Sequence, residues 1–176
     1  MNSIDKKSIE EVLKSFKQLK GWSGKTTKND YEKYDIIFSD NKNRKVLAEV
    51  KQRKFDVDDI IKYNSKGYLL EVDKYNYLKN NKSVYINYIE VKDYEIIFII
   101  TFDVENIDYD ISELNCPTTS HYYDKATKSK KVINIPIQKN NSIYVKRNGI
   151  YRSISLVKFE ELLDKLSLDF MKKLIK

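Results

Sequence analysis

The chain has 176 residues, of which 41% are hydrophobic, so it is long enough to fold as one domain with a substantial core. No apolar run approaches the roughly 18 residues of a membrane-spanning helix, and charges interrupt the N-terminal segment where a signal peptide would be apolar. The net charge of +7 suits a polyanionic partner, and the single cysteine, Cys116, permits no disulfide within the chain. We therefore expect a cytoplasmic protein without membrane association.

The first predicted element is an amphipathic helix that Ser3 or Asn2 can cap and that runs to about Lys20. Its expected buried stripe consists of Ile9, Val12, Leu13, Phe16 and Leu19. Glu10 and Glu11 flank this stripe on opposite sides. Acids near a helix N-terminus are also favoured by the helix dipole, so their presence alone does not assign them a function.

A β-hairpin is predicted over residues 34–52, with its turn at residues 40–44. This register places Asp35 opposite Glu49, with their Cβ atoms about 5 Å apart. Because side chains alternate along a strand, Lys51 points to the same face as Glu49. The hairpin therefore gathers two carboxylates and an ammonium group on one face.

This group of charges on otherwise apolar strands favours metal-dependent cleavage of phosphodiester bonds. Desolvating such charges is costly unless they bind a cation or a phosphate, and two carboxylates opposite one another repel without a cation. The alternative is that they are ordinary charges on the solvated face of a sheet. A register shift of one residue would separate them.

Two short helices are predicted after the hairpin. The first begins at the cap-like pair Asp56 and Asp59 and runs to about Tyr63. The second spans about residues 71–80 and carries Lys74. This lysine would lie either in the active cleft or on the solvated face of the helix.

The rest of the chain is predicted to be rich in β-strands and to end in a helix. Strands at residues 83–91 and 94–102 form a hairpin, and the second is apolar enough to lie buried on both faces. Residues 103–129 are expected to be irregular, either a DNA-contacting flap or a disordered surface loop. The remaining elements are a strand, a hairpin and an amphipathic helix, at residues 132–137, 143–154 and 156–174. That helix could pack on the sheet or form a dimer.

The order of Glu10, Asp35, Glu49 and Lys51, on a helix and two consecutive strands, resembles the PD-(D/E)xK nuclease superfamily. The spacing is similar to that of the archaeal Holliday-junction resolvases over about the first half of the chain. Tyr34 stands where the motif name has proline, at a position that varies in the superfamily. The C-terminal half does not resemble the compact resolvases.

The resemblance implies an α/β fold with a restriction-endonuclease-like core, in which helices flank a central mixed sheet, followed by a C-terminal β-hairpin and helix. We expect a single nuclease-like domain with its core at about residues 1–103 and a C-terminal elaboration at about 104–176.

The resemblance also implies roles for individual residues. The implied ligands of Mg²⁺, for which Mn²⁺ could substitute, are two carboxylates, a backbone carbonyl and a helix acid: Asp35, Glu49, Val50 and Glu10. Lys51 would position the attacking water and stabilise charge that develops on the phosphorus. Glu11 remains an alternative to Glu10 as the helix acid.

The predicted function is a Mg²⁺-dependent DNA endonuclease. The predicted nucleic-acid contacts are basic residues near the hairpin or on the second short helix: Lys25, Lys28, Arg53, Lys54 and Lys74. A homodimer is one expectation, because cutting both strands of a duplex often requires two active sites. The alternative function is a noncatalytic module that binds nucleic acid or protein and retains the fold. The sequence does not distinguish DNA from RNA.

Overall fold

The computed structural model describes residues 3–27, 34–91, 94–104, 111–117 and 127–174. Its helices are α1 (Ser3–Lys20), α2 (Val57–Lys66), α3 (Val72–Asn80) and α4 (Leu156–Leu174). A large sheet contains, in spatial order, β1 (Ser23–Thr26), β2 (Ile36–Ser39), β3 (Lys45–Phe55), β5 (Val84–Val91), β6 (Ile96–Asp103), β9 (Ser142–Arg147) and β10 (Ile150–Ile154). A small sheet contains β4 (Tyr68–Glu71), β8 (Thr127–Ile135) and β7 (Ile111–Pro117), in that order.

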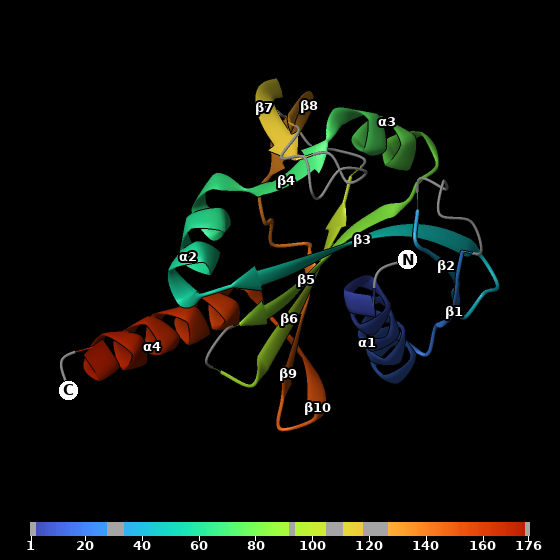
Figure 1. Ribbon diagram of the computed structural model, residues 1–176. Coiled ribbons are helices and arrows are strands. Elements are labelled where there is room, and N and C mark those ends of the chain that lie inside the picture. Colours follow the sequence, from blue (N-terminus) through green and yellow to red (C-terminus); the bar gives the residue numbers. More distant parts are fainter. Residues whose placement is uncertain (1–2, 28–33, 92–93, 105–110, 118–126, 175–176) are drawn as a thin grey trace.

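The large sheet is mixed and helices flank it, which makes the fold α/β (Figure 1). Strands β3 and β5 run parallel, and the other neighbouring pairs in the sheet are antiparallel. The C-terminal hairpin β9–β10 joins the same sheet through the pairing of β9 with β6. The predicted C-terminal hairpin and helix are therefore confirmed, and the hairpin extends the central sheet.

The connection between the parallel strands β3 and β5 contains α2, β4 and α3. Asp56 and Asp59 start α2 with a capping box, in which each side chain accepts a hydrogen bond from the other's backbone N–H. Gly67 ends α2 with a φ of +88°, and a Cβ there would lie 3.0 Å from the backbone of Ile135. This close approach brings the following strand, β4, alongside β8.

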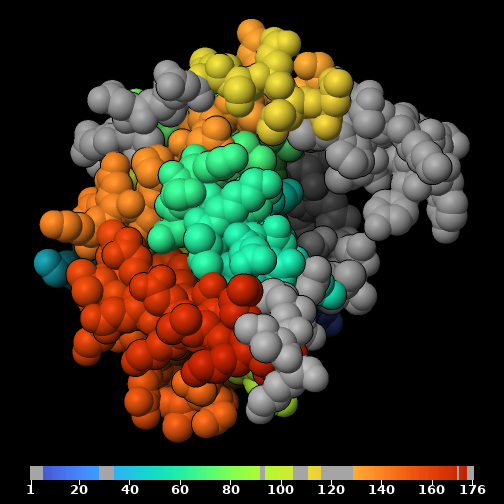
Figure 2. All heavy atoms as spheres, turned by 90° about the vertical axis from the view of Figure 1, so that its left-hand side faces the viewer, coloured from blue at the N-terminus to red at the C-terminus, as the bar shows by residue number. Residues whose placement is uncertain are grey.

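Each face of the large sheet has its own core. The buried stripe of α1 packs on one face, against side chains from β2, β3, β5, β6, β9 and β10. The other face packs against α2, the small sheet, α3 and α4. Helices α2 and α4 contact each other and lie side by side at the surface (Figure 2). Glu49 belongs to the second face, because its neighbour Ala48 lies under α1.

A short strand, β1, follows α1, and its exposed Ser-Gly-Lys-Thr sequence gives little strand signal. Gly24 fits there because a Cβ would lie 2.6 Å from Leu13 and 2.8 Å from Phe38. The predicted irregular region at 103–129 contains all of β7 and the start of β8, which pair with each other. No helix among the described residues is long and apolar enough to cross a membrane.

Candidate active site

Asp35 lies where β3 separates from β2. The antiparallel ladder of these strands runs from the pair Ile36–Ala48 to the turn, in the predicted register. The backbone N–H of Asp35 donates to the carbonyl of Ala48 at 2.8 Å. Its carboxylate accepts a hydrogen bond from the N–H of Val50 at 2.7 Å. The regular ladder thus stops before the predicted Asp35–Glu49 pair, but the carboxyl group of Asp35 is held against β3.

Glu49, the residue of β3 that precedes Val50, is a buried acid with 4% of its surface exposed. Burial, followed by the negative charge of Asp35, raises the pKa of the Glu49 carboxyl to about 7. The nearby ammonium groups of Lys74 and Lys51 offset part of this increase. The Glu49 carboxyl therefore titrates near neutral pH, and a further cation beside it would favour its charged form.

Two lysines accompany the acids. Lys51 is exposed on the same face of β3 as Glu49. Lys74 reaches over from α3 and forms an ion pair with Oε1 of Glu49. Burial alone would lower the pKa of Lys74, but the carboxylates of Glu49, Asp35 and Glu71 raise it above its ordinary value. Lys74 is therefore positively charged at neutral pH.

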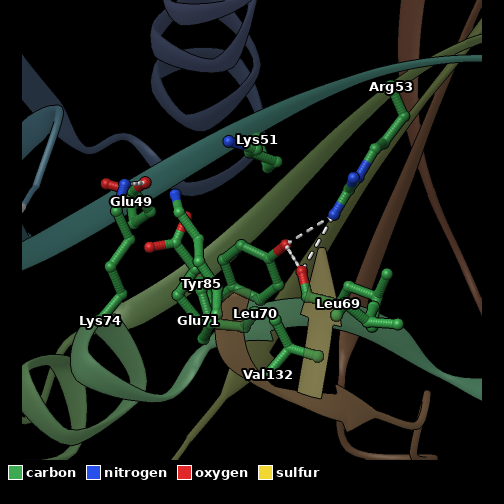
Figure 3. Close-up of a pocket in the computed structure, with 11 residues that line it drawn as sticks. Glu49, Lys51, Arg53, Leu69, Leu70, Glu71, Lys74, Tyr85 and Val132 are labelled. Carbon is green, nitrogen blue, oxygen red and sulfur yellow. Dashed lines mark hydrogen bonds and ion pairs between the residues drawn. The ribbon is translucent and has the colours of Figure 1, made fainter. Parts of the chain in front are cut away.

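These groups lie at one end of a cavity of about 340 Å³ (Figure 3). The cavity is formed between the large sheet, the small sheet and α3, and its lining residues are Glu49, Lys51, Arg53, Leu69, Leu70, Glu71, Lys74, Tyr85, Leu114, Lys130 and Val132. Glu71 and Lys130 form an ion pair of 2.7 Å. The pKa of Glu71 is lowered: burial would raise it, but the hydrogen bond and charge of Lys130 outweigh burial. The charged side chains that line the cavity thus come from the large sheet, the small sheet and α3.

Arg53 lies farther into the same cavity and has structural partners. Its Nη2 donates to the carbonyl of Leu69 at 3.0 Å and to the hydroxyl of Tyr85 at 3.3 Å, and its Nε donates to Oδ1 of Asn87 at 3.2 Å. The Tyr85 hydroxyl also donates to Leu69, at 2.8 Å. These bonds join β3 and β5 to β4, so Arg53 contributes to the wall between the two sheets as well as to the surface of the cavity.

Two other predicted nucleic-acid contacts, Lys25 and Lys54, are not among the residues that line this cavity. Lys25 is exposed on β1, opposite Ile37, and so lies on the same sheet face as Glu49. Lys54 alternates to the opposite face, the one that α1 covers. Lys28 lies outside the described residues.

The two candidate helix acids have different surroundings. Glu10 is exposed on α1, a helix that packs on the sheet face opposite Glu49. Glu11 is buried and accepts hydrogen bonds from Lys146 and from the hydroxyl of Tyr151. Burial would raise the pKa of Glu11, but these bonds together lower it. Glu11 is therefore an anchor between α1 and the hairpin β9–β10, and the catalytic role of Glu10 stays a prediction.

The donor set suits a hard cation that keeps some of its water ligands. Among the described residues, no three His, Cys, Asp or Glu side chains are close enough to enclose a metal ion. Mg²⁺, however, commonly takes only one or two carboxylates and completes its shell with water and phosphate oxygens. Asp35 and Glu49 provide such a pair, because Asp35 lies close enough for its negative charge to add to the rise in the Glu49 pKa that burial causes. The residues present therefore fit Mg²⁺ or Mn²⁺.

Sequence reasoning named Lys74 as a possible cleft residue but missed other contributors to the cavity. Glu71 precedes Lys74 by three positions at the start of α3, a spacing that indicates a shared face. This signal could have drawn attention to Glu71 as well. No comparable signal exists for Lys130, which is 59 positions from its partner Glu71. In the sequence, Tyr85 is one of several aromatic residues of a predicted strand, and nothing in its pattern indicates that it lines a cavity.

No protein-family model, curated protein or solved structure matches this chain.

Proposed function

We propose that this chain is a Mg²⁺-dependent deoxyribonuclease of the PD-(D/E)xK type, built on a restriction-endonuclease-like core. The observation that supports the proposal best is the buried carboxyl of Glu49, whose pKa is raised by burial and by Asp35. It lies beside two ammonium groups at an open cavity, those of Lys51 and Lys74. A phosphate and a divalent cation would satisfy all of these charges together.

In the proposed mechanism Asp35 and Glu49 would hold the cation. When bound, Mg²⁺ lowers the pKa of a water ligand and neutralises negative charge on the phosphate. The exposed ammonium of Lys51 binds the scissile phosphate and stabilises the charge that develops there. Lys74 pairs with Glu49 in this structure and would be able to bind a phosphate oxygen of the substrate if a cation replaced it beside that carboxylate.

The second candidate is a noncatalytic module that binds nucleic acid or protein. The ion pair between Lys74 and Glu49 favours it, because Lys74 already provides a cation for the buried acid. In that case Asp35 serves only as the hydrogen-bond acceptor for Val50. Such a module would bind its partner without Mg²⁺.

The two candidates differ in a cleavage assay with single-stranded, duplex and branched DNA and with RNA. The nuclease cuts at least one substrate with Mg²⁺ or Mn²⁺ and stops with EDTA. We expect Lys51→Ala to slow cleavage by about 100-fold or more. The matched control is Lys17→Ala, which removes an exposed lysine from α1, on the other side of the sheet.

Two results would decide against the nuclease. If Lys51→Ala cuts as fast as the parent protein, the activity comes from another site or from a contaminant. If no substrate is cut but the chain binds DNA equally well with and without Mg²⁺, the binding module is correct. Gel filtration of the active protein tests the expected homodimer.

A further inference from the structure

The cavity beside Glu49 has a charged end and an apolar end (Figure 3). The charged end holds Glu49, Lys51, Glu71, Lys74 and Lys130. The apolar walls are Leu69, Leu70, Leu114 and Val132, together with the ring of Tyr85. Its volume of about 340 Å³ lies at the small end of the range for small-molecule sites. It offers room for one flat heterocycle next to its phosphate, and a base-paired duplex is too wide to enter.

One charged side chain, Arg53, lies at the otherwise apolar end and has hydrogen-bonding capacity left over. The guanidinium of Arg53 uses Nε and Nη2 for its bonds, and its Nη1 makes none with the described residues. Asn87, which bonds to both Arg53 and Tyr85, is fully buried and is not among the residues that line the cavity, so it supports these two side chains without contacting a ligand. Apolar walls with a few polar groups at one end are typical of sites that bind a heterocycle and read its edge.

The charged end is arranged to receive the phosphate of the same nucleotide. Lys51, Lys74 and Lys130 contribute three ammonium groups to the cavity lining, from β3, α3 and β8. Lys74 pairs with Glu49 and Lys130 with Glu71 in this structure, so a phosphate would compete with these two carboxylates for their ammonium groups. Lys25 and Lys45 line a second hollow on the same face of the sheet, and they add positive charge to that face. A nucleic-acid strand can therefore keep its phosphates along the lysines while one base turns inward between the two sheets.

We infer that this cavity binds one unpaired base of the substrate, next to the phosphate that is cut. The inference rests on the proposed nuclease function and deepens it by assigning a substrate class. A base can enter only after it leaves its stack and its pair, which is least costly in single-stranded DNA and at frayed or flapped ends. The chain is thus a nuclease for unpaired DNA, and the cavity formed by the small sheet supplies that preference.

The test blocks the cavity from its exposed side. Leu114 lines it from β7 and is 39% exposed, so Leu114→Trp fills the entrance without disturbing a buried core position. Ile111→Trp is the matched control, because Ile111 is an exposed apolar residue of the same strand that does not line the cavity. Ile111 is three positions from Leu114, so its side chain lies on the opposite face of the strand. Cleavage of single-stranded and blunt duplex DNA is measured for the parent and both variants.

We expect the parent to prefer the single strand in kcat/KM, and Leu114→Trp to lower single-strand cleavage by about tenfold or more. Ile111→Trp retains the parent rates. A second readout needs no catalysis: a fluorescent adenine analogue in a short single strand reports insertion of the base in the presence of EDTA. Its signal and affinity fall with Leu114→Trp and are retained with Ile111→Trp.

The outcomes separate this inference from the nuclease proposal. If Leu114→Trp cuts and binds single strands as well as the parent, the cavity does not bind a base, while loss of activity in Lys51→Ala still supports the nuclease. If the parent cuts nothing, the nuclease proposal fails, and the binding measurement in EDTA then tests the base site alone. The base site is supported if the parent binds single strands more tightly than duplex and Leu114→Trp abolishes this difference. It is overturned if the parent and Leu114→Trp bind single strands with equal affinity.

Discussion

The ammonium group of Lys74 forms an ion pair with the carboxylate of Glu49, which joins α3 to β3 across 25 positions of the chain. The Glu49 side chain is 5% exposed and the Lys74 side chain 33%. A bound cation would compete with Lys74 for the same carboxylate. This competition links the position of α3 to the occupancy of the proposed metal site.

Removing the lysine should destabilise the protein most when Glu49 is charged. For Lys74→Met we expect the free energy of unfolding at pH 8 to fall by about 1–3 kcal/mol, because a buried acid loses its cation. The loss should be smaller at pH 5, where Glu49 is mostly protonated. Urea denaturation at both pH values measures it. Lys79→Met, at an exposed position of the same helix, is the control. Equal losses at the two pH values would contradict the expected coupling to Glu49.

The raised pKa of Glu49 predicts a loss of stability as the pH rises. The folded pKa is about 7 and the ordinary value is 4.5, so between these values the folded state binds more protons than the unfolded state. Stability therefore decreases from about pH 4.5 to 7. Glu49→Gln cannot titrate, so its change in unfolding free energy across this range should be smaller than the parent's by up to about 3 kcal/mol. Parallel pH profiles for the two proteins would argue against a raised pKa.

The same titration should control metal binding. A cation binds the deprotonated carboxylate, so saturating Mg²⁺ should raise the Tm of the parent more at pH 8 than at pH 6. Thermal denaturation with and without EDTA measures the difference. Glu49→Gln should show no increase at either pH. An increase that is the same at both pH values in the parent would show that the ion binds elsewhere.

Two substitutions of Asp35 separate its charge from its hydrogen bond. Asp35→Asn keeps an oxygen that can accept from the N–H of Val50, whereas Asp35→Ala removes it. Both should abolish the Mg²⁺-induced rise in Tm, because both remove a ligand charge. Only Asp35→Ala should also lower the stability of the metal-free protein, by about 1 kcal/mol. Retention of the metal effect in Asp35→Asn would exclude Asp35 as a charged ligand.

Glu10 and Glu11 should respond differently to the same substitution. Glu11→Gln weakens the bonds to Lys146 and Tyr151, so we expect it to lower the free energy of unfolding by about 1–3 kcal/mol. Glu10→Gln changes an exposed residue and should leave stability within about 0.5 kcal/mol. If Glu10 supplies the predicted helix acid, Glu10→Gln slows cleavage at unchanged stability. Parent-like cleavage by Glu10→Gln would remove Glu10 from the site.

Local sequence patterns determined the parts of the fold that depend on neighbouring residues. The register of β2 and β3 follows from alternating side chains and a short polar turn, and it is confirmed from Ile36 to the turn. Asn148 and Gly149 form the tight turn of the C-terminal hairpin with φ angles of +50° and +77°, which asparagine and glycine adopt readily. The apolar stripe of α1 likewise predicted its buried face.

The small sheet and the cavity were decided by tertiary structure. Strand β4 is only four residues long, and its partner β8 lies more than 50 positions away, so neither reveals the other. The same separation hides the approach of Lys130 to Glu71 and the role of Arg53 in joining the two sheets. Side-chain periodicity indicates which face of a strand is buried, but it does not identify the distant segment that covers that face. The sequence therefore determined which charges share a strand face, and only long-range packing decided which of them meet around one cavity.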